Sequence, residues 1–347
     1  MKRLMISLGL MVCLAASALA QADAKAQDVI KKARAAIGKE DKLKGLQNVV
    51  AEVNFKRSFG QFNQEGTIEL VMAGQDKVYQ ATSSVQGGNE NIDIQVLNVD
   101  KTWTDRIAGM GGGGGFGGGG AGRGPGGPGG FLDPATQEKN RRNGLARVLL
   151  GFFLTAPGVD YVYAGEAKAP DGTVADIVQA KAADGPVAKL YIDRTSSQLL
   201  MLSYKDKDMR SLMRGGRPPG QGGPGGAPPA PGAPGAQAGG QNNQQNNQQR
   251  IQEELAKLPP AERAKREAEI AAQRETRMAE MKALYDKAPE IDFRWSFAEY
   301  KSEGGLNLPH LITRSQGQDP PNEEWVIAKY KFNDKKVTPE KFEKKTK

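Results

Sequence analysis

Cysteine and histidine are nearly absent from this chain of 347 residues, which contains one of each. Cys13 lies in an apolar run at the start of the chain, and His310 lies near its end. One histidine cannot form a histidine-based metal cluster, or a catalytic pair that needs two imidazoles. His310 follows the segment LNLP in a strand-like run, so we expect it to be a residue of a sheet rather than a catalyst.

Long apolar runs are missing beyond the first residues, so the sequence predicts no transmembrane segment in the mature chain. The chain begins with MKR, continues with a short apolar run over residues 4–14, and then reaches the small residues of AASALA. This order is typical of a secretory signal peptide, here residues 1–20, for which we expect cleavage near Ala20. Cleavage would remove Cys13 and leave the mature chain without a disulfide or a thiol nucleophile. We therefore expect an exported, periplasmic protein.

Motifs for catalysis or phosphate binding are also missing. No G-x-x-x-x-G-K-[ST] segment occurs, and the glycine-rich stretches lack the strand, helix and acid that a dinucleotide fingerprint needs. Acidic pairs such as Glu253-Glu254 and Glu323-Glu324 fall on predicted surfaces, and nothing selects a pair for general acid–base catalysis. Few arginines and almost no aromatic residues accompany the glycines, unlike in RNA-binding segments. These observations disfavour an enzyme, a bound cofactor or metal, and a nucleic-acid partner.

Two segments have too few apolar side chains to belong to a core. Residues 108–130 contain 16 glycines in 23 positions, and residues 210–250 are rich in glycine, proline, glutamine and asparagine. Burial of apolar surface could not offset the conformational entropy lost on ordering them, so we expect two flexible, disordered insertions. Residues 251–288 hold eight basic and eight acidic residues among strong helix formers, which predicts a long, mostly solvated helix.

The remaining segments, residues 21–107, 131–209 and 289–347, are together long enough for one sizeable domain. Residues 26–46 and 136–153 show the apolar spacing of amphipathic helices. Elsewhere, runs with apolar residues at every second position follow one another through short turns, which implies antiparallel neighbours. We predict an α+β, mostly antiparallel β fold: an unclosed, strongly curved β-barrel with helices over its open side and a basic tail at its end.

Two strands show an apolar face clearly. In the segment IDFRWSFAEYK, the side chains of Phe293, Trp295 and Phe297 alternate with polar or small ones. The same alternation in the closing strand, EEWVIAKYKF, predicts one face made of Val326, Ala328, Tyr330 and Phe332. Each strand therefore turns one row of apolar side chains toward a core.

Four segments follow one another in an order that carries a family resemblance: YAGEAKAPDGTVADIVQAK, AKLYIDRTSSQLLMLSYKD, WSFAEYKSEGGLNLPHLITRS and FNDKKVTPEKFE. Their recurring marks are Gly165, Gly172, Tyr191, Ile192, Asp193, Thr195, Leu199, Tyr300, Gly305, Leu308, Pro309 and Phe342. The succession resembles the outer-membrane lipoprotein-sorting proteins, the LolA/LolB-like superfamily. The resemblance implies an unclosed antiparallel barrel whose apolar hollow takes the acyl chains of a lipoprotein across the periplasm. The two insertions depart from the family pattern.

The apolar strand residues are the candidates for lining such a hollow. We predict a ligand-binding set made of Ile68, Leu70, Leu190, Ile192, Phe293, Trp295 and Phe297. The same side chains could instead form an ordinary core between the sheet and its helices, because a barrel must fill its interior. An open hollow predicts a dry apolar cavity reached from one rim, whereas an interior filled by side chains would argue against a carrier.

Two functions remain open at this point. The first is an exported periplasmic binding protein that holds an acyl chain or another lipid, in the manner of a lipoprotein carrier or chaperone. The alternative is a non-catalytic envelope scaffold with the same fold, whose residues 210–288 contact an envelope protein partner. The basic end of the chain, with eight lysines and three acids over residues 329–347, could touch anionic lipid.

Overall fold

A computed structural model describes residues 23–59, 62–86, 89–108, 132–169, 172–208 and 255–344 of the chain. The expected signal peptide, the glycine-rich insertion, residues 210–250 and the last three residues lie outside the described residues. The chain divides into two compact units, and each is described by itself. The first comprises residues 1–122, 134–206 and 291–347, and the second comprises residues 123–133 and 207–290.

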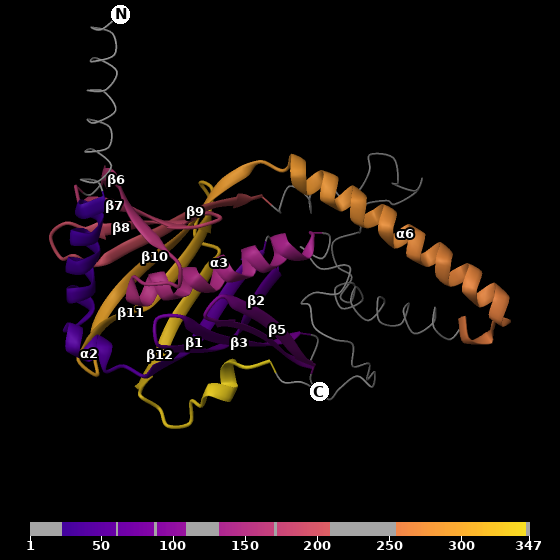
Figure 1. The fold of residues 1–347 in the computed structure, drawn as a ribbon, viewed down its shortest axis with the longest axis horizontal. Helices are drawn as coiled ribbons and strands as arrows, with labels where there is room; N and C mark the ends of the chain where they lie inside the picture. Colours follow the sequence, from indigo (N-terminus) through magenta and orange to yellow (C-terminus); the bar gives the residue numbers. More distant parts are fainter. Residues whose placement is uncertain are drawn as a thin grey trace, which may run out of the picture. The chain divides into compact units, whose positions relative to one another are not determined.

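The first unit is built on one sheet of twelve strands, which remains open (Figure 1). The strand order is β5-β4-β3-β2-β1-β12-β11-β10-β9-β8-β7-β6. Strands consecutive in the chain lie side by side except β5 and β6, which form the two edges, and the two ends of the strand series meet where β1 pairs with β12. The pairings given residue by residue are all antiparallel. The strands are β1 (Asn48–Phe59), β2 (Phe62–Ala73), β3 (Lys77–Gln86), β4 (Asn89–Asn98), β5 (Lys101–Ala108), β6 (Asp160–Lys168), β7 (Val174–Ala182), β8 (Gly185–Asp193), β9 (Leu199–Lys207), β10 (Glu290–Glu303), β11 (Leu306–Gln316) and β12 (Glu323–Phe332).

The helix α3 (Pro134–Phe153) joins the two open edges, β5 and β6, in sequence and lies across the sheet (Figure 1). The helix starts at Pro134, and proline is favoured at a first helical position. The apolar residues of its last three turns form its buried side. The helix ends at Leu154, whose φ of 54° is left-handed and whose N–H donates to Leu150 O at 3.2 Å. We call the sheet face that α3 covers the inner face.

Most buried apolar residues form one core on the inner face. The strands contribute alternate side chains, as Val49, Ala51, Val53 and Phe55 of β1 show. A second, smaller core lies on the outer face of β1–β5, where Val50 and Val71 pack with Phe342 of the short 3₁₀ helix η1 (Pro339–Phe342). The sheet therefore has apolar residues on both faces where the end of the chain covers it.

The first helical segment differs from the single helix expected over residues 26–46. The structure has a helix over residues 23–37 and a separate short helix, α2 (Glu40–Lys44). The chain leaves the first helix at Gly38, and Lys39 adopts an extended conformation with φ of −60° and ψ of 139°. Glycine and the extended residue after it break a periodic pattern that otherwise continues through both helices.

The face predicted for the closing strand is confirmed at Tyr330 and Phe332, which belong to or pack on the inner core, and is wrong at Val326 and Ala328. Val326 is exposed at 43%, whereas Trp325 and Ile327 are buried on the inner face together with Tyr330. The cause is a β-bulge in β12: Glu52 pairs with Lys329 but Val53 pairs with Ile327, so Ala328 has no partner residue. One extra residue reverses the alternation on either side of it, and strict period-two reasoning cannot anticipate that.

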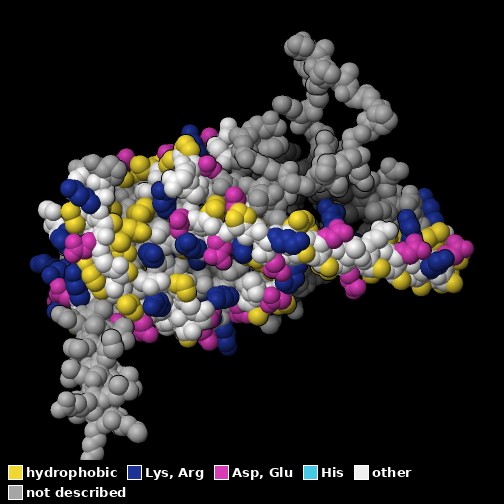
Figure 2. All heavy atoms as spheres, turned by 90° about the horizontal axis from the view of Figure 1, so that it is seen from above, with side chains coloured by type: hydrophobic (Ala, Val, Ile, Leu, Met, Phe, Trp, Pro, Cys, Tyr) yellow, Lys and Arg dark blue, Asp and Glu magenta, His cyan; other side chains and the backbone are white. Residues whose placement is uncertain are grey.

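The second unit contains the helix α6 (Pro260–Lys287), which begins later than the helix expected over residues 251–288. Pro259 and Pro260 set its start, since proline fits the first helical position but interrupts a helix interior. None of the residues of α6 is buried, and charges of both signs follow one another along it (Figure 2). No helix among the described residues is long and apolar enough to cross a membrane.

Candidate functional site

The seven residues predicted to line a hollow come from β2, β8 and β10 and meet on the inner face. Six are buried in the inner core: Ile68, Leu70, Leu190, Ile192, Trp295 and Phe297. Phe293 is half-buried, and its ring stacks on that of Tyr204 at a centroid distance of 5.3 Å. The structure thus brings the set together, and its role in ligand binding stays a prediction.

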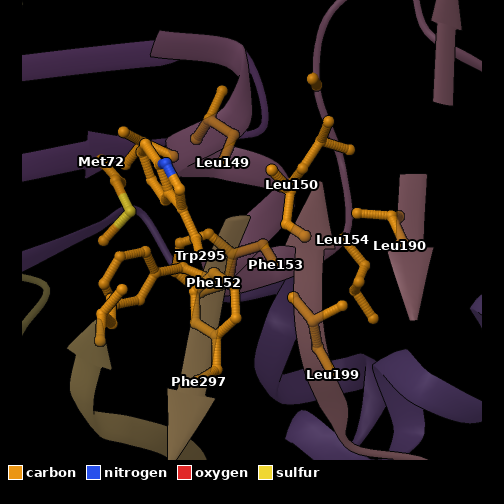
Figure 3. Close-up of a cluster of buried hydrophobic side chains, with 14 of the residues drawn as sticks. Met72, Leu149, Leu150, Phe152, Phe153, Leu154, Leu190, Leu199, Trp295 and Phe297 are labelled. Atoms are coloured by element: carbon orange, nitrogen blue, oxygen red, sulfur yellow. The ribbon is translucent and has the colours of Figure 1, made fainter. Parts of the chain in front are cut away.

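α3 fills most of the space in front of these residues. Its Leu149, Leu150, Phe152 and Phe153 interleave with strand side chains that include Trp295 and Phe297 (Figure 3). The contact is close at Gly151, where an added Cβ would lie 2.7 Å from Cζ of Phe297. A gap of about 10 Å³ beside Gly151 has room for about one water molecule. In this state the inner face is a packed core, so the open hollow expected from the sequence is wrong for the described residues, and the filled interior argues against a preformed carrier cavity.

A larger cavity of about 210 Å³ lies where β1 begins and α3 ends. Its buried apolar wall is formed by Leu43, Met72 and Phe153, with the half-buried Leu46. Its mouth is polar, since Lys44 and Gln75 are exposed and Arg34 and Thr155 are half-buried. Five of the ten lining residues are polar, with the buried Asn48 among them, so the cavity is more polar and smaller than typical small-molecule sites, which are mainly apolar and measure ~300–1,000 Å³. Binding a lipid here requires the cavity to widen.

Two hydrogen bonds join residues that line this cavity. Arg34 of the first helix donates from Nη1 to the carbonyl oxygen of Phe153, the last residue of α3, at 3.0 Å. A cation at a helix C-terminus also meets the negative end of the helix dipole. Next to it, Thr155 Oγ1 donates to Gln75 Oε1 at 3.2 Å, between the chain after α3 and the β2–β3 turn. We call the Arg34–Phe153 bond the latch.

At the opposite end of the inner face lies a charged cluster that sequence reasoning missed. Glu323 was expected on the surface, and this is wrong: it is buried, and it accepts hydrogen bonds from Arg57, Arg314 and Trp325. The donor–acceptor distances are 2.7, 2.9 and 2.6 Å. Burial alone would raise the pKa of Glu323, but the charge of Arg314 and the bond from Arg57 outweigh it and lower that pKa. The spacing in the sequence could have indicated this burial, because Glu323 lies two residues before Trp325 and therefore on the same face of the strand.

His310, the chain's single histidine, has structural partners. His310 is buried in β11, as expected for a sheet residue, and its Nε2 lies 2.8 Å from Oε1 of Glu303. Among the described residues, no three His, Cys, Asp or Glu side chains gather as a metal site would require. The features that could bind a ligand are therefore the cavity beside the latch and the inner core that continues from it.

Comparisons with known proteins give distant structural similarities. No family model and no curated protein matches the chain. Similar solved structures include an outer membrane lipoprotein-sorting protein domain from Vibrio parahaemolyticus (9% identity, TM-score 0.41) and a LolA superfamily protein from Nitrosomonas europaea (7%, 0.41). A DUF1329 family protein from Desulfovibrio piger is also similar (10%, 0.39), and each alignment covers 92% of this chain and 97% of the other. Two of these bear the names of the family that the sequence resembles. The fold class expected from the sequence, an unclosed antiparallel barrel, is confirmed by the strand order itself.

Proposed function

We propose that the chain is a periplasmic carrier of an acyl chain or a similar apolar ligand, which it holds between the curved sheet and α3. The observation that carries the proposal is the cavity beside the latch, whose apolar wall runs directly into the inner core through Met72 and Phe153. The ligand would enter at the polar mouth and extend along the seven predicted residues as α3 moves aside.

The sheet permits such a movement because its strand pairing does not include α3, although side-chain bonds such as Arg147 to the Val187 carbonyl would have to break. The ladder runs without a break from β5 to β6, and α3 only covers its inner face. Displacing the helix therefore exposes side chains but breaks no strand pairing. Conformational change in proteins often takes this form, in which one packed element shifts against a fixed one.

Burial of the α3 side chains and burial of an acyl chain in their place contribute free energies of similar size. α3 buries six large apolar side chains, and each contributes ~1.5–3 kcal/mol, or about 9–18 kcal/mol together. An acyl chain of about sixteen carbons gains ~0.8 kcal/mol per buried CH₂, or about 12 kcal/mol. A ligand can thus replace much of what α3 contributes, and its release remains feasible because α3 returns to the same surface.

The test is native mass spectrometry of the protein purified from the periplasm, with lipid extraction of the same sample. The proposal predicts an acyl-chain ligand at close to one per protein. Leu46→Trp fills the cavity and should lower ligand recovery, whereas Leu311→Trp should not, since Leu311 pairs with the exposed Val326 away from the cavity. A ligand-free mass in the wild type, together with no uptake of a fluorescent fatty acid, would contradict the carrier function.

The scaffold function is supported by a different observation, the exposure of α6. A helix of 28 residues with none buried contributes little to a core and leaves most of its surface open to contacts. If residues 210–288 contact an envelope protein, deleting them should abolish in vivo cross-links to that partner while the sheet stays folded. Loss of fatty-acid uptake without loss of cross-links would argue against the scaffold and for a role of this segment in the carrier.

A further inference from the structure

The charged cluster at the far end of the inner face extends beyond Glu323 and its two arginines. Arg147 of α3 lies over the ring of Tyr204, with its Cζ 3.5 Å from the ring centroid. The ring of Tyr204 stacks on Phe293 at an interplanar angle of 14°. A guanidinium on an aromatic face is a stabilising arrangement, and here it completes a stack of three side chains from α3, β9 and β10.

Two further contacts orient the groups. Arg147 donates from Nε to the carbonyl oxygen of Val187 at 2.9 Å, and Arg314 donates from Nη2 to the Tyr204 hydroxyl at 3.5 Å. Tyr204 therefore contacts both arginines, one through its ring and one through its oxygen. The Nε bond and the stack fix the plane of the Arg147 guanidinium, and among the described residues its two terminal nitrogens form no hydrogen bond to the protein.

Arg147 lies outside the ion pairs that Glu323 makes with Arg57 and Arg314. Glu323 is shared by Arg57 and Arg314, and no carboxylate of the described residues lies within 4.0 Å of the Arg147 guanidinium. Burial lowers the pKa of Arg147, and the nearby charge of Arg314 acts in the same direction, against the charge of Asp206. A partly buried guanidinium without an ion pair is unfavourable unless another anion meets it.

The guanidinium is planar and presents paired donors that match the two oxygens of a carboxylate or phosphate. Arg147 is held in place before any ligand arrives, so little entropy is lost when an anion binds. The neighbouring arginines are partly open to solvent, with side chains 26% exposed at Arg57 and 25% at Arg314, so an anion can reach the cluster. We propose that Arg147, with Arg314 beside it, binds the oxyanion group of a ligand, a carboxylate or a phosphate. This site lies apart from the latch cavity and does not depend on the carrier function.

The first experiment is a calorimetric titration of the full chain with inorganic phosphate and with hexyl phosphate, at constant ionic strength set with chloride. The proposal predicts saturable binding of at least one of them and a loss of roughly tenfold or more in affinity for Arg147→Met, as expected when a charge-assisted contact is removed. Arg106→Met is the matched control, because Arg106 lies on the edge strand β5 and is already paired with Asp93 at 2.6 Å. Its affinity for phosphate should equal that of the wild type.

The effect of phosphate on thermal unfolding provides an independent readout. Phosphate should raise the melting temperature of the wild type and leave that of Arg147→Met unchanged, whereas a residue with a purely structural role would leave the same phosphate-induced rise in both proteins. If the variant folds poorly, the arginines of the wild type can be labelled with phenylglyoxal instead. The proposal predicts that phosphate slows the modification of Arg147 and does not slow that of Arg106.

The outcomes separate the sources of the anion. Much tighter binding of hexyl phosphate than of phosphate assigns the site to the head group of an amphiphile, and equal binding assigns it to a free anion; both support the site. Binding no tighter than that of chloride, or unchanged binding in Arg147→Met, overturns the proposal. Because Leu46→Trp leaves this end of the sheet untouched, loss of acyl uptake in that variant with intact phosphate binding distinguishes the two proposals.

Discussion

Replacing Arg34 with methionine tests whether the latch controls access to the cavity. Methionine keeps much of the aliphatic stem but removes the donor to the Phe153 carbonyl. The bond joins a charged group to a carbonyl, and the Arg34 side chain is only 16% exposed, so its removal should cost the closed state ~1.5–3 kcal/mol. The ion pair from Arg34 to the exposed Glu40, at 3.8 Å, adds little.

This loss should have two opposite effects. The open population should rise roughly 10- to 100-fold, and the apparent affinity for a fatty acid should rise by the same factor while the open state remains minor. The melting temperature without ligand should fall by about 3–12 °C, given ~2–4 °C per kcal/mol for a domain of this size. Both are measured on one sample, by titration with a fluorescent fatty acid and by thermal unfolding.

The control is Lys32→Met on the same helix, where Lys32 pairs with Asp28 across an exposed turn at 2.7 Å. That pair is solvent-exposed, so affinity and melting temperature should both stay within about 0.5 kcal/mol of the wild type. A variant at Arg34 that melts earlier but binds fatty acid no more tightly would refute the latch, because the bond would then stabilise the fold without controlling access.

Other predictions concern the core and the buried carboxylate. Gly151→Ala places a methyl group 2.7 Å from the Phe297 ring and should lower the free energy of unfolding by ~1–3 kcal/mol, partly offset by the better helix propensity of alanine. Gly144→Ala, on the same helix with nothing within 4 Å, should raise it by up to ~1 kcal/mol, and urea unfolding compares the two. Glu323→Gln leaves two arginines without their shared anion and should cost ~3 kcal/mol or more at pH 7. Since the folded-state pKa of Glu323 is lowered, its stabilisation is present above the unfolded-state pKa of ~4.3 and is lost as pH falls through the folded pKa. The difference in unfolding free energy between wild type and variant should therefore become smaller below about pH 4 than it is at pH 7. A difference that is the same at both pH values would argue against the ion pairs.

Local patterns predicted most of the sheet. The turns at residues 74–76 and 194–198 and the alternation in β8 and β10 carry enough information to place strands and inner faces, because each depends only on neighbours in sequence. The bulge at Ala328 escaped prediction for the same reason: it depends on how β12 registers with β1, far away in the chain. A local rule cannot report a register set by a distant partner.

The site was predictable only in part. Strand periodicity identified the residues of the inner face, but not that α3 would pack into the space in front of them. The latch joins residues 119 positions apart, and the charged cluster gathers side chains from β1, α3, β9, β11 and β12. Contacts between residues so far apart in the chain follow from the topology of the fold. The sequence pattern around Glu323 showed only a pair of neighbouring acids, which was predicted to lie on the surface.

The central claim, that an acyl chain enters the inner core, is tested most directly by fluorescence quenching with a brominated fatty acid. Trp295 and Trp325 lie in the inner core with ring centroids 5.7 Å apart, whereas Trp103 lies in the outer core and donates to the Phe342 carbonyl at 3.1 Å. In a Trp103→Phe variant, the account predicts saturable quenching at about one fatty acid per chain. In the variant that keeps Trp103 alone, with phenylalanine at 295 and 325, it predicts none. Absence of quenching in the first variant, or equal quenching in both, would contradict a ligand site between the sheet and α3.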